Sequence, residues 1–163
     1  MTLHEVARRV GLRQPSLYVY VSSKLDLYDA MFAQANAELW GRIQDAGETG
    51  DARQQLLRLS RVILEFAVEE PARQQLLFTR TIPGFAPTEA SLENARRVIG
   101  RAEQLLSELG RGTATDVEIY TAVIAGLGAQ QVANDPNGSQ WTRHLEVMLD
   151  LVLDHLPDAH QSA

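Results

Sequence analysis

Residues 2–24 read TLHEVARRVGLRQPSLYVYVSSK, and this stretch carries the clearest structural signal in the sequence. Its pattern predicts two short helices, over about 2–10 and 15–21, because Gly11 interrupts the first and Pro15 suits the opening turn of the second. Two short helices joined by a tight turn predict a helix-turn-helix, in which the second helix enters the major groove of DNA.

The leading edge of that second helix carries side chains that can read base edges. Arg13 could pair with guanine, Gln14 with adenine and Ser16 with either base, while Pro15 offers only an apolar contact. The predicted phosphate contacts, which set register rather than sequence preference, are Thr2, Tyr18, Tyr20 and Lys24. Packing of Tyr18 or Tyr20 into the core stays open as an alternative.

The charge distribution separates this head from the rest of the chain. Residues 1–24 carry four basic side chains and one acidic one, a formal charge of +3, and the remainder carries −9, which gives the overall −6. A small basic head on an acidic body is typical of a DNA-binding tip, although chance in a short window remains the alternative.

Helical periodicity dominates the remaining sequence, and no alternating strand pattern stands out. Ser22 or Ser23 is predicted to cap a long helix that ends at Gly47. Thr88 is predicted to start a later helix, and Thr115 with Glu118 has the spacing of a capping box. The predicted helices after the head cover about 23–46, 51–69, 71–80, 88–109, 115–134 and 139–156.

The last two predicted helices each carry two apolar stripes, which indicates that both of their faces are buried. In a chain of 163 residues one of those faces fits a partner subunit, and a buried central helix pair is the alternative. The small residues Gly126, Gly128 and Ala129 would permit close helix approach. The predicted interface residues are Tyr120, Ile124, Leu127, Gln131, His144, Met148, Leu151 and His155.

Aromatic residues of the middle helices suggest a pocket for a small, largely apolar effector. The loop around Phe85 is apolar enough to gate its entrance. Each aromatic residue has core packing as its alternative role. The predicted lining residues are Trp40, Phe66, Phe78, Arg80, Phe85, Tyr120 and Gln130, with Gln131 as a further polar contact.

Composition argues against several other classes of protein. The chain has no cysteine, no glycine-rich phosphate loop and no nucleophile or zinc-protease motif, so we expect neither an enzyme nor a cofactor. His144 and His155 are too far apart along one helix to share a metal within a subunit, and no metal is expected. No segment is apolar enough for a membrane span, and no signal-peptide layout opens the sequence, which predicts a cytoplasmic protein.

The run from Thr2 to Ala30, above all Leu-Tyr-x-Tyr-Val-x-Ser-Lys over 17–24, resembles the helix-turn-helix of the TetR family. The resemblance implies an all-α regulator that dimerises through its last two helices, binds an effector in its helical body and leaves a palindromic operator when the effector binds. By family pattern, Gln14, Pro15 and Ser16 contact bases, and Thr2, Tyr18, Tyr20 and Lys24 contact the backbone. The expected domains are a helix-turn-helix segment (1–24), a connecting helix (25–46), an effector-binding and dimerisation domain (47–157) and a frayed tail (158–163).

The sequence departs from the family pattern in one respect, because the family has a further helix before the position of Thr2 that covers the helix-turn-helix. If no such helix precedes Met1, Val6, Val10, Leu17 and Val21 would lack that cover, at a cost of about 1.5–3 kcal/mol each. The alternatives are that the true start lies upstream of Met1, that the helix has been lost, or that this form is deficient in DNA binding. Residues 1–24 are therefore expected to be the least stable part of the chain. The alternative function is a helical dimer that binds a small molecule or a protein but not DNA.

Overall fold

The computed structural model describes residues 23–69, 71–79 and 82–155, and all regular structure within these ranges is helical. The main helices are α3 (Lys24–Ala46), α4 (Ala52–Glu69), α6 (Leu92–Glu108), α7 (Ala114–Asn134) and α8 (Leu145–His155). A short α5 (Pro71–Gln74) continues into a π-helical turn, η1 (Gln75–Thr79), and a 3₁₀ turn, η2 (Thr142–His144), precedes α8. The predicted all-α fold is confirmed, while the predicted helix-turn-helix over 2–21 lies outside the described residues.

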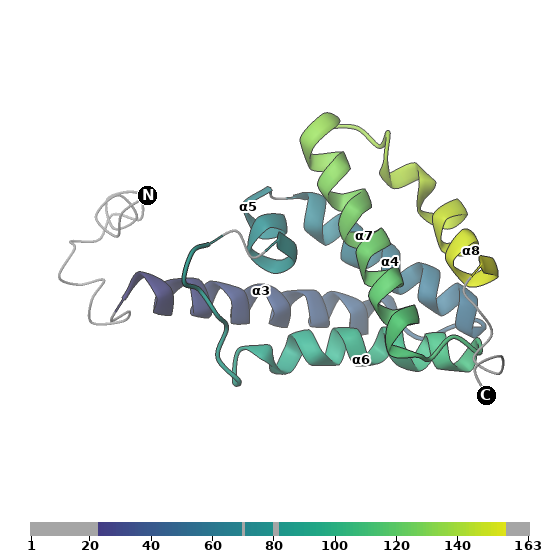
Figure 1. The fold of residues 1–163 in the computed structure, drawn as a ribbon, viewed down its shortest axis with the longest axis horizontal. Coiled ribbons are helices and arrows are strands. Elements are labelled where there is room, and N and C mark those ends of the chain that lie inside the picture. Colours follow the sequence, from purple (N-terminus) through teal and green to yellow (C-terminus); the bar gives the residue numbers. More distant parts are fainter. Residues whose placement is uncertain (1–22, 70, 80–81, 156–163) are drawn as a thin grey trace.

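Helix α4 is the centre of the bundle, since it packs against α3, α6, α7 and α8. Figure 1 shows α3 and α6 lying side by side along the length of the molecule, with α7 crossing α4 and α8 next to α7. The buried side of α4 includes Leu56, Ile63, Leu64 and Phe66. The helix therefore buries its apolar stripe in the middle of the body.

Local signals in the sequence explain where most helices begin and end. Ser23 accepts a hydrogen bond from the Asp26 amide (3.1 Å) at the start of α3, and Gly47 takes a φ of 72° after its end. At the end of α6, the Gly110 and Arg111 amides bond back to the carbonyls of Ser107 and Leu106, which closes a Schellman motif. The predicted bounds of α3 and α4 are confirmed.

Three predicted helix starts were wrong. Helix α6 begins at Leu92 rather than at Thr88, whose side chain and amide bond to Asp29 of α3 instead. The capping box of α7 is formed by Thr113 and Asp116, so the box at Thr115 does not exist. The segment after Ser139 first forms η2, and α8 proper begins only at Leu145.

Candidate functional site

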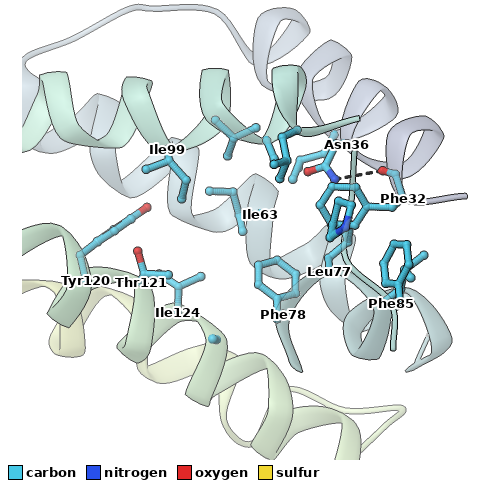
Figure 2. Close-up of a pocket in the computed structure, with 17 residues that line it drawn as sticks. Phe32, Asn36, Ile63, Leu77, Phe78, Phe85, Ile99, Tyr120, Thr121 and Ile124 are labelled. Atoms are coloured by element: carbon cyan, nitrogen blue, oxygen red, sulfur yellow. Dashed lines mark hydrogen bonds between the residues drawn. The ribbon is translucent and has the colours of Figure 1, made fainter. Parts of the chain in front are cut away.

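A cavity of about 260 Å³ lies between α3, α4, η1, the loop before α6, and helices α6 and α7. Figure 2 shows its lining side chains converging from these elements. The lining residues are Phe32, Asn36, Leu39, Ile63, Leu76, Leu77, Phe78, Phe85, Pro87, Leu92, Ala95, Val98, Ile99, Tyr120, Thr121, Ile124 and Ala125. This lining is mostly aliphatic and aromatic, and none of its members is an acid, a lysine, an arginine or a histidine, as suits a site for an uncharged apolar ligand.

The π-helical turn η1 helps to shape one wall of this cavity. Three successive residues of η1, Leu76, Leu77 and Phe78, all line the space. A π-helical turn is wider than an α-helical turn and is frequent at functional sites. The sequence predicted a plain helix over about 71–80, so the position was right and the local geometry was not.

The loop between η1 and α6 closes the cavity with an aromatic side chain. Gly84, at a φ of 74°, and a hydrogen bond from the Phe85 amide to the Ile82 carbonyl turn the chain back towards α3. The Phe85 ring then meets the rings of Tyr28 and Phe32 edge-on, with centroids 6.0 and 6.2 Å apart. The loop is therefore packed on the N-terminal half of α3.

A polar clamp holds the end of the same loop to α3. The carboxylate of Asp29 accepts hydrogen bonds from the Thr88 amide (2.8 Å), the Thr88 hydroxyl (2.9 Å) and the Ser91 hydroxyl (2.7 Å). These bonds, that of Ser91 first, lower the pKa of Asp29 below its usual range because they favour the charged form. The cavity loop and α3 are thus joined by both apolar and charge-assisted contacts.

Tyr120 lies on the boundary between the cavity and the packed core. Its hydroxyl is 2.9 Å from that of Ser60, which itself donates to the Leu56 carbonyl (2.7 Å). A serine hydroxyl has one proton, so Tyr120 is the donor in this pair. Burial raises the pKa of Tyr120 to about 12, and its phenol stays neutral.

Asn36 on α3 is the polar side chain that sequence reasoning missed. It is 5% exposed and lines the cavity among apolar neighbours. Its Nδ2 donates to the Phe32 carbonyl (2.9 Å), as Figure 2 shows. The signal was present in the sequence, because Asn36 interrupts the apolar stripe of Phe32, Ala35 and Leu39.

The structure brings together three of the residues predicted to line the pocket, namely Phe78, Phe85 and Tyr120. Trp40 instead borders a separate hollow of about 100 Å³ beside Arg58 and Arg101. Gln130 is exposed and bonds to Asn134. Arg80 lies outside the described residues.

Phe66 also differs from its predicted place in the pocket. It is fully buried, and the guanidinium groups of Arg42 and Arg73 lie 4.8 and 4.1 Å from its ring centroid. Glu38 and Glu69 pair with both arginines. Phe66 is therefore a core residue under an ion-pair network that joins α3, α4 and α5.

The predicted dimer face of α7 points into its own subunit. Tyr120, Ile124 and Leu127 are 3–7% exposed and belong to the internal core. Gln131 is buried too, where its carboxamide accepts from the Trp141 and Thr142 amides and donates to the Asp135 and Gly138 carbonyls, so it organises the turn between α7 and η2. These four assignments are corrected, because the buried stripe of α7 serves the fold.

The remaining predicted interface residues lie on or beside α8. His144 and Leu151 are exposed, and Met148 is half-buried. The side chain of His155 is not among the side chains that the structure describes. Gly128 is buried against α4, where an added Cβ would stand 3.4 Å from Leu64, so its small size serves packing within the subunit.

Of the predicted DNA contacts, only Lys24 falls within the described residues. It is exposed at the first turn of α3, with its ammonium group 5.5 Å from the Tyr28 ring centroid. Thr2, Arg13, Gln14, Pro15, Ser16, Tyr18 and Tyr20 all lie outside the described residues.

The described residues were also compared with what a membrane span or a metal site requires. In the described ranges, no helix is long and apolar enough to cross a bilayer. Across those same residues, no three histidine, aspartate or glutamate side chains come close enough to share a metal ion.

The described residues thus combine the long helix α3, a mostly apolar cavity and a helical body. A solved structure of a TetR/AcrR-family transcriptional regulator from Thermobifida fusca matches with a TM-score of 0.55 and 22% identity, over 96% of this chain and 87% of that one. The fold is therefore that of the TetR/AcrR regulators, which confirms the resemblance that the N-terminal sequence predicted.

The chain is also similar in sequence to known transcriptional regulators. HTH-type transcriptional regulators from Mycobacterium bovis and from Mycobacterium tuberculosis are 29% identical over 104 residues, which is 61% of this chain. The match spans 44% of the length of each of these relatives. No protein-family model matches the sequence.

Proposed function

We propose that the chain is a DNA-binding transcriptional regulator, a repressor that leaves a palindromic operator when a small, largely apolar effector enters the cavity. The observation that carries this proposal is the place of the cavity. Its wall includes Phe32 and Asn36 of α3, the helix that begins at Lys24, directly after the predicted DNA-reading segment. The TetR/AcrR fold and the HTH-type relatives support the same function.

Helix α3 is the proposed lever between effector and DNA. A ligand in the cavity meets Phe85 and Pro87 of the closing loop, and Asp29 ties that loop to the first turns of α3. A ligand that favours one position of the loop therefore favours one position of α3. Effector and operator then select different members of one conformational equilibrium, and each weakens the binding of the other.

The proposed regulator is cytoplasmic and acts as a homodimer. Two copies are needed because two recognition helices must lie about 34–36 Å apart to enter successive major grooves. The large apolar residues of α7 and α8 that are exposed are Ile119, Val147 and Leu151, at 37%, 59% and 47%. Gly126 is exposed on α7, and an added Cβ there would meet nothing within 4 Å, so a second helix could approach closely. We place the dimer contact on this outer face.

The test of DNA binding is a gel-shift assay with the DNA that flanks the gene. Gln14→Ala and Tyr18→Ala should each weaken binding strongly, since they remove a base contact and a phosphate contact. Sedimentation should show an unchanged dimer in both variants. Unaltered binding would refute the residue assignment, and a wild-type protein that binds effector but no flanking DNA would favour the alternative of a non-DNA-binding helical dimer.

The dimer face is tested by charge insertion. Val147→Arg should split the dimer, because an unpaired charge in an apolar contact is costly. Glu103→Arg on the exposed side of α6 is the matched control and should leave the dimer intact. A Val147→Arg protein that remains a dimer would move the interface elsewhere.

A further inference from the structure

The polar side chains of the cavity differ in which hydrogen-bond donors and acceptors remain free to bind a ligand. Thr121 uses its only proton in a hydrogen bond to the Val117 carbonyl (2.7 Å), so it can only accept. Tyr120 directs its proton to Ser60, away from any ligand. Asn36 is different, because a carboxamide has two donor hydrogens and an acceptor oxygen.

The hydrogen bond to Phe32 fixes the orientation of the Asn36 carboxamide. A carbonyl oxygen accepts only, so the atom facing it must be Nδ2, which donates one of its two hydrogens. Among the residues that the structure describes, the second Nδ2 hydrogen and Oδ1 have no hydrogen-bond partner. Asn36 is only 5% exposed and lines the cavity, so a ligand in the cavity is positioned to use these hydrogen-bonding groups.

We infer that the cavity takes an uncharged apolar ligand with a single carbonyl or hydroxyl group, which Asn36 binds. The inference rests on the proposed function only in treating this cavity as the effector site. A ligand carbonyl would accept from Nδ2, and a ligand hydroxyl would donate to Oδ1. Asn36 thereby determines specificity for a neutral polar group, while Phe32, Phe78 and Phe85 enclose the apolar part.

The same lining argues against charged ligands. A carboxylate or an ammonium group in this space would lose its hydration and meet no ion of opposite charge among the lining residues. The neutral amide of Asn36 can bond to either ion but cannot compensate a full charge. A neutral compound avoids that penalty and keeps the same hydrogen bond.

The experiment compares three probes of nearly equal size by calorimetry on the full chain: phenyl propyl ketone, butylbenzene and phenylbutyrate. The ketone should bind about three- to tenfold more tightly than butylbenzene, the value of one hydrogen bond, and phenylbutyrate should bind more weakly than both. Equal or tighter binding of phenylbutyrate than of the ketone would overturn the inference. Failure of the ketone to bind at all would also overturn it.

The variant Asn36→Leu tests the hydrogen bond between Asn36 and the ligand. Leucine has nearly the same shape, so the variant should lose the preference for the ketone over butylbenzene while keeping its affinity for butylbenzene. Asn134→Leu, at an exposed position outside the cavity, should keep the preference. If Asn36 were merely structural, the variant would weaken both probes alike and leave their ratio unchanged, which would contradict the inference.

The test of DNA binding and the test of ligand binding through Asn36 can succeed or fail independently. A protein that binds the ketone through Asn36 but never shifts DNA would retain the inference and refute the proposed regulator. A protein that binds its operator but shows no preference dependent on Asn36 would do the reverse.

Discussion

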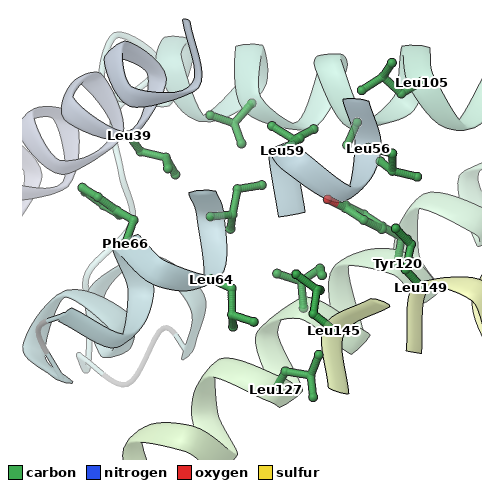
Figure 3. Close-up of a cluster of buried hydrophobic side chains, with 14 of the residues drawn as sticks. Leu39, Leu56, Leu59, Leu64, Phe66, Leu105, Tyr120, Leu127, Leu145 and Leu149 are labelled. Carbon is green, nitrogen blue, oxygen red and sulfur yellow. The ribbon is translucent and has the colours of Figure 1, made fainter. Parts of the chain in front are cut away.

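The two ends of the helical body use the same kinds of side chain and differ in how they fill space. Towards α8, Leu56, Leu105, Leu106 and Leu149 are almost completely buried against one another, as Figure 3 shows for leucines of α4, α6 and α8 with Tyr120. Towards the start of α3, similar aliphatic and aromatic residues enclose about 260 Å³ of empty space.

The difference in packing predicts which end contributes more to the stability of the fold. Close packing supplies the dispersion and burial that hold a fold together, so the filled end carries most of the stability. The cavity end forgoes part of that packing and is bordered by a loop and a π-helical turn. If the cavity binds the proposed effector, we expect the half next to α3 to change shape more readily than the half next to α8.

The comparison predicts the largest effect for truncating a side chain at the filled end. Leu106→Ala should lower the free energy of unfolding by about 2–5 kcal/mol, since it leaves a new cavity in a packed core. Leu92→Ala, on the same helix but beside the existing cavity, should cost clearly less because its neighbours already face empty space. Chemical denaturation measures both, and equal losses would show that the two ends are packed alike.

Enlarging an alanine should produce the opposite contrast. Ala102 is 1% exposed in the core, and Ala102→Leu should cost about 1–3 kcal/mol through overpacking. Ala95 lines the cavity, so Ala95→Leu should leave stability unchanged or slightly raised and should abolish binding of phenyl propyl ketone. A destabilised Ala95→Leu protein would mean that the cavity is smaller in solution.

The filled end was largely predictable from sequence and the cavity end only in part. Leu145, Leu149 and Val152 have the spacing of one helical face in the sequence, and all three are buried in the structure. Ser23 and Gly47 gave the bounds of α3 because capping is decided within a few residues.

The predictions that were wrong concern features set by contacts between segments that are distant in the sequence. Thr88 looked like a helix start, yet its partner Asp29 is 59 residues away. Helix α7 is apolar on nearly every face, so spacing alone could not tell the buried stripe of Ile124 from the outer one of Ile119. Phe66 was assigned to the pocket by its residue type, which does not reveal which aromatic rings the packing encloses.

Tyr120 joins the two ends, and its hydroxyl is the next smaller test. Tyr120→Phe should cost about 0.5–1.5 kcal/mol at neutral pH, the value of one buried hydrogen bond. Because burial raises the pKa of Tyr120 from 10.0 to about 12, the unfolded chain ionises first, and this residue's contribution to stability is lost as pH rises through that interval. Tyr120→Phe should reduce the alkaline loss of stability seen in urea titrations, and an unchanged profile would place the phenol in water.

The smallest effect on global stability is expected at the clamp between Asp29 and the cavity loop, although its local effect should be clear. Asp29→Asn removes the negative charge that Thr88 and Ser91 bind, so the Thr88 amide should exchange with solvent severalfold faster while amides of α4 keep their protection. The lowered pKa of Asp29 means that its contribution is complete above the ordinary range of an aspartic acid and is lost as pH falls through the lowered value. Acidification of the wild type should therefore release the Thr88 amide before the core opens, and Glu93→Gln, which removes an exposed carboxylate from the same end of α6, should not change that order. Simultaneous release of loop and core would show that the loop is no looser than the filled end, and the contrast between the two halves would fail.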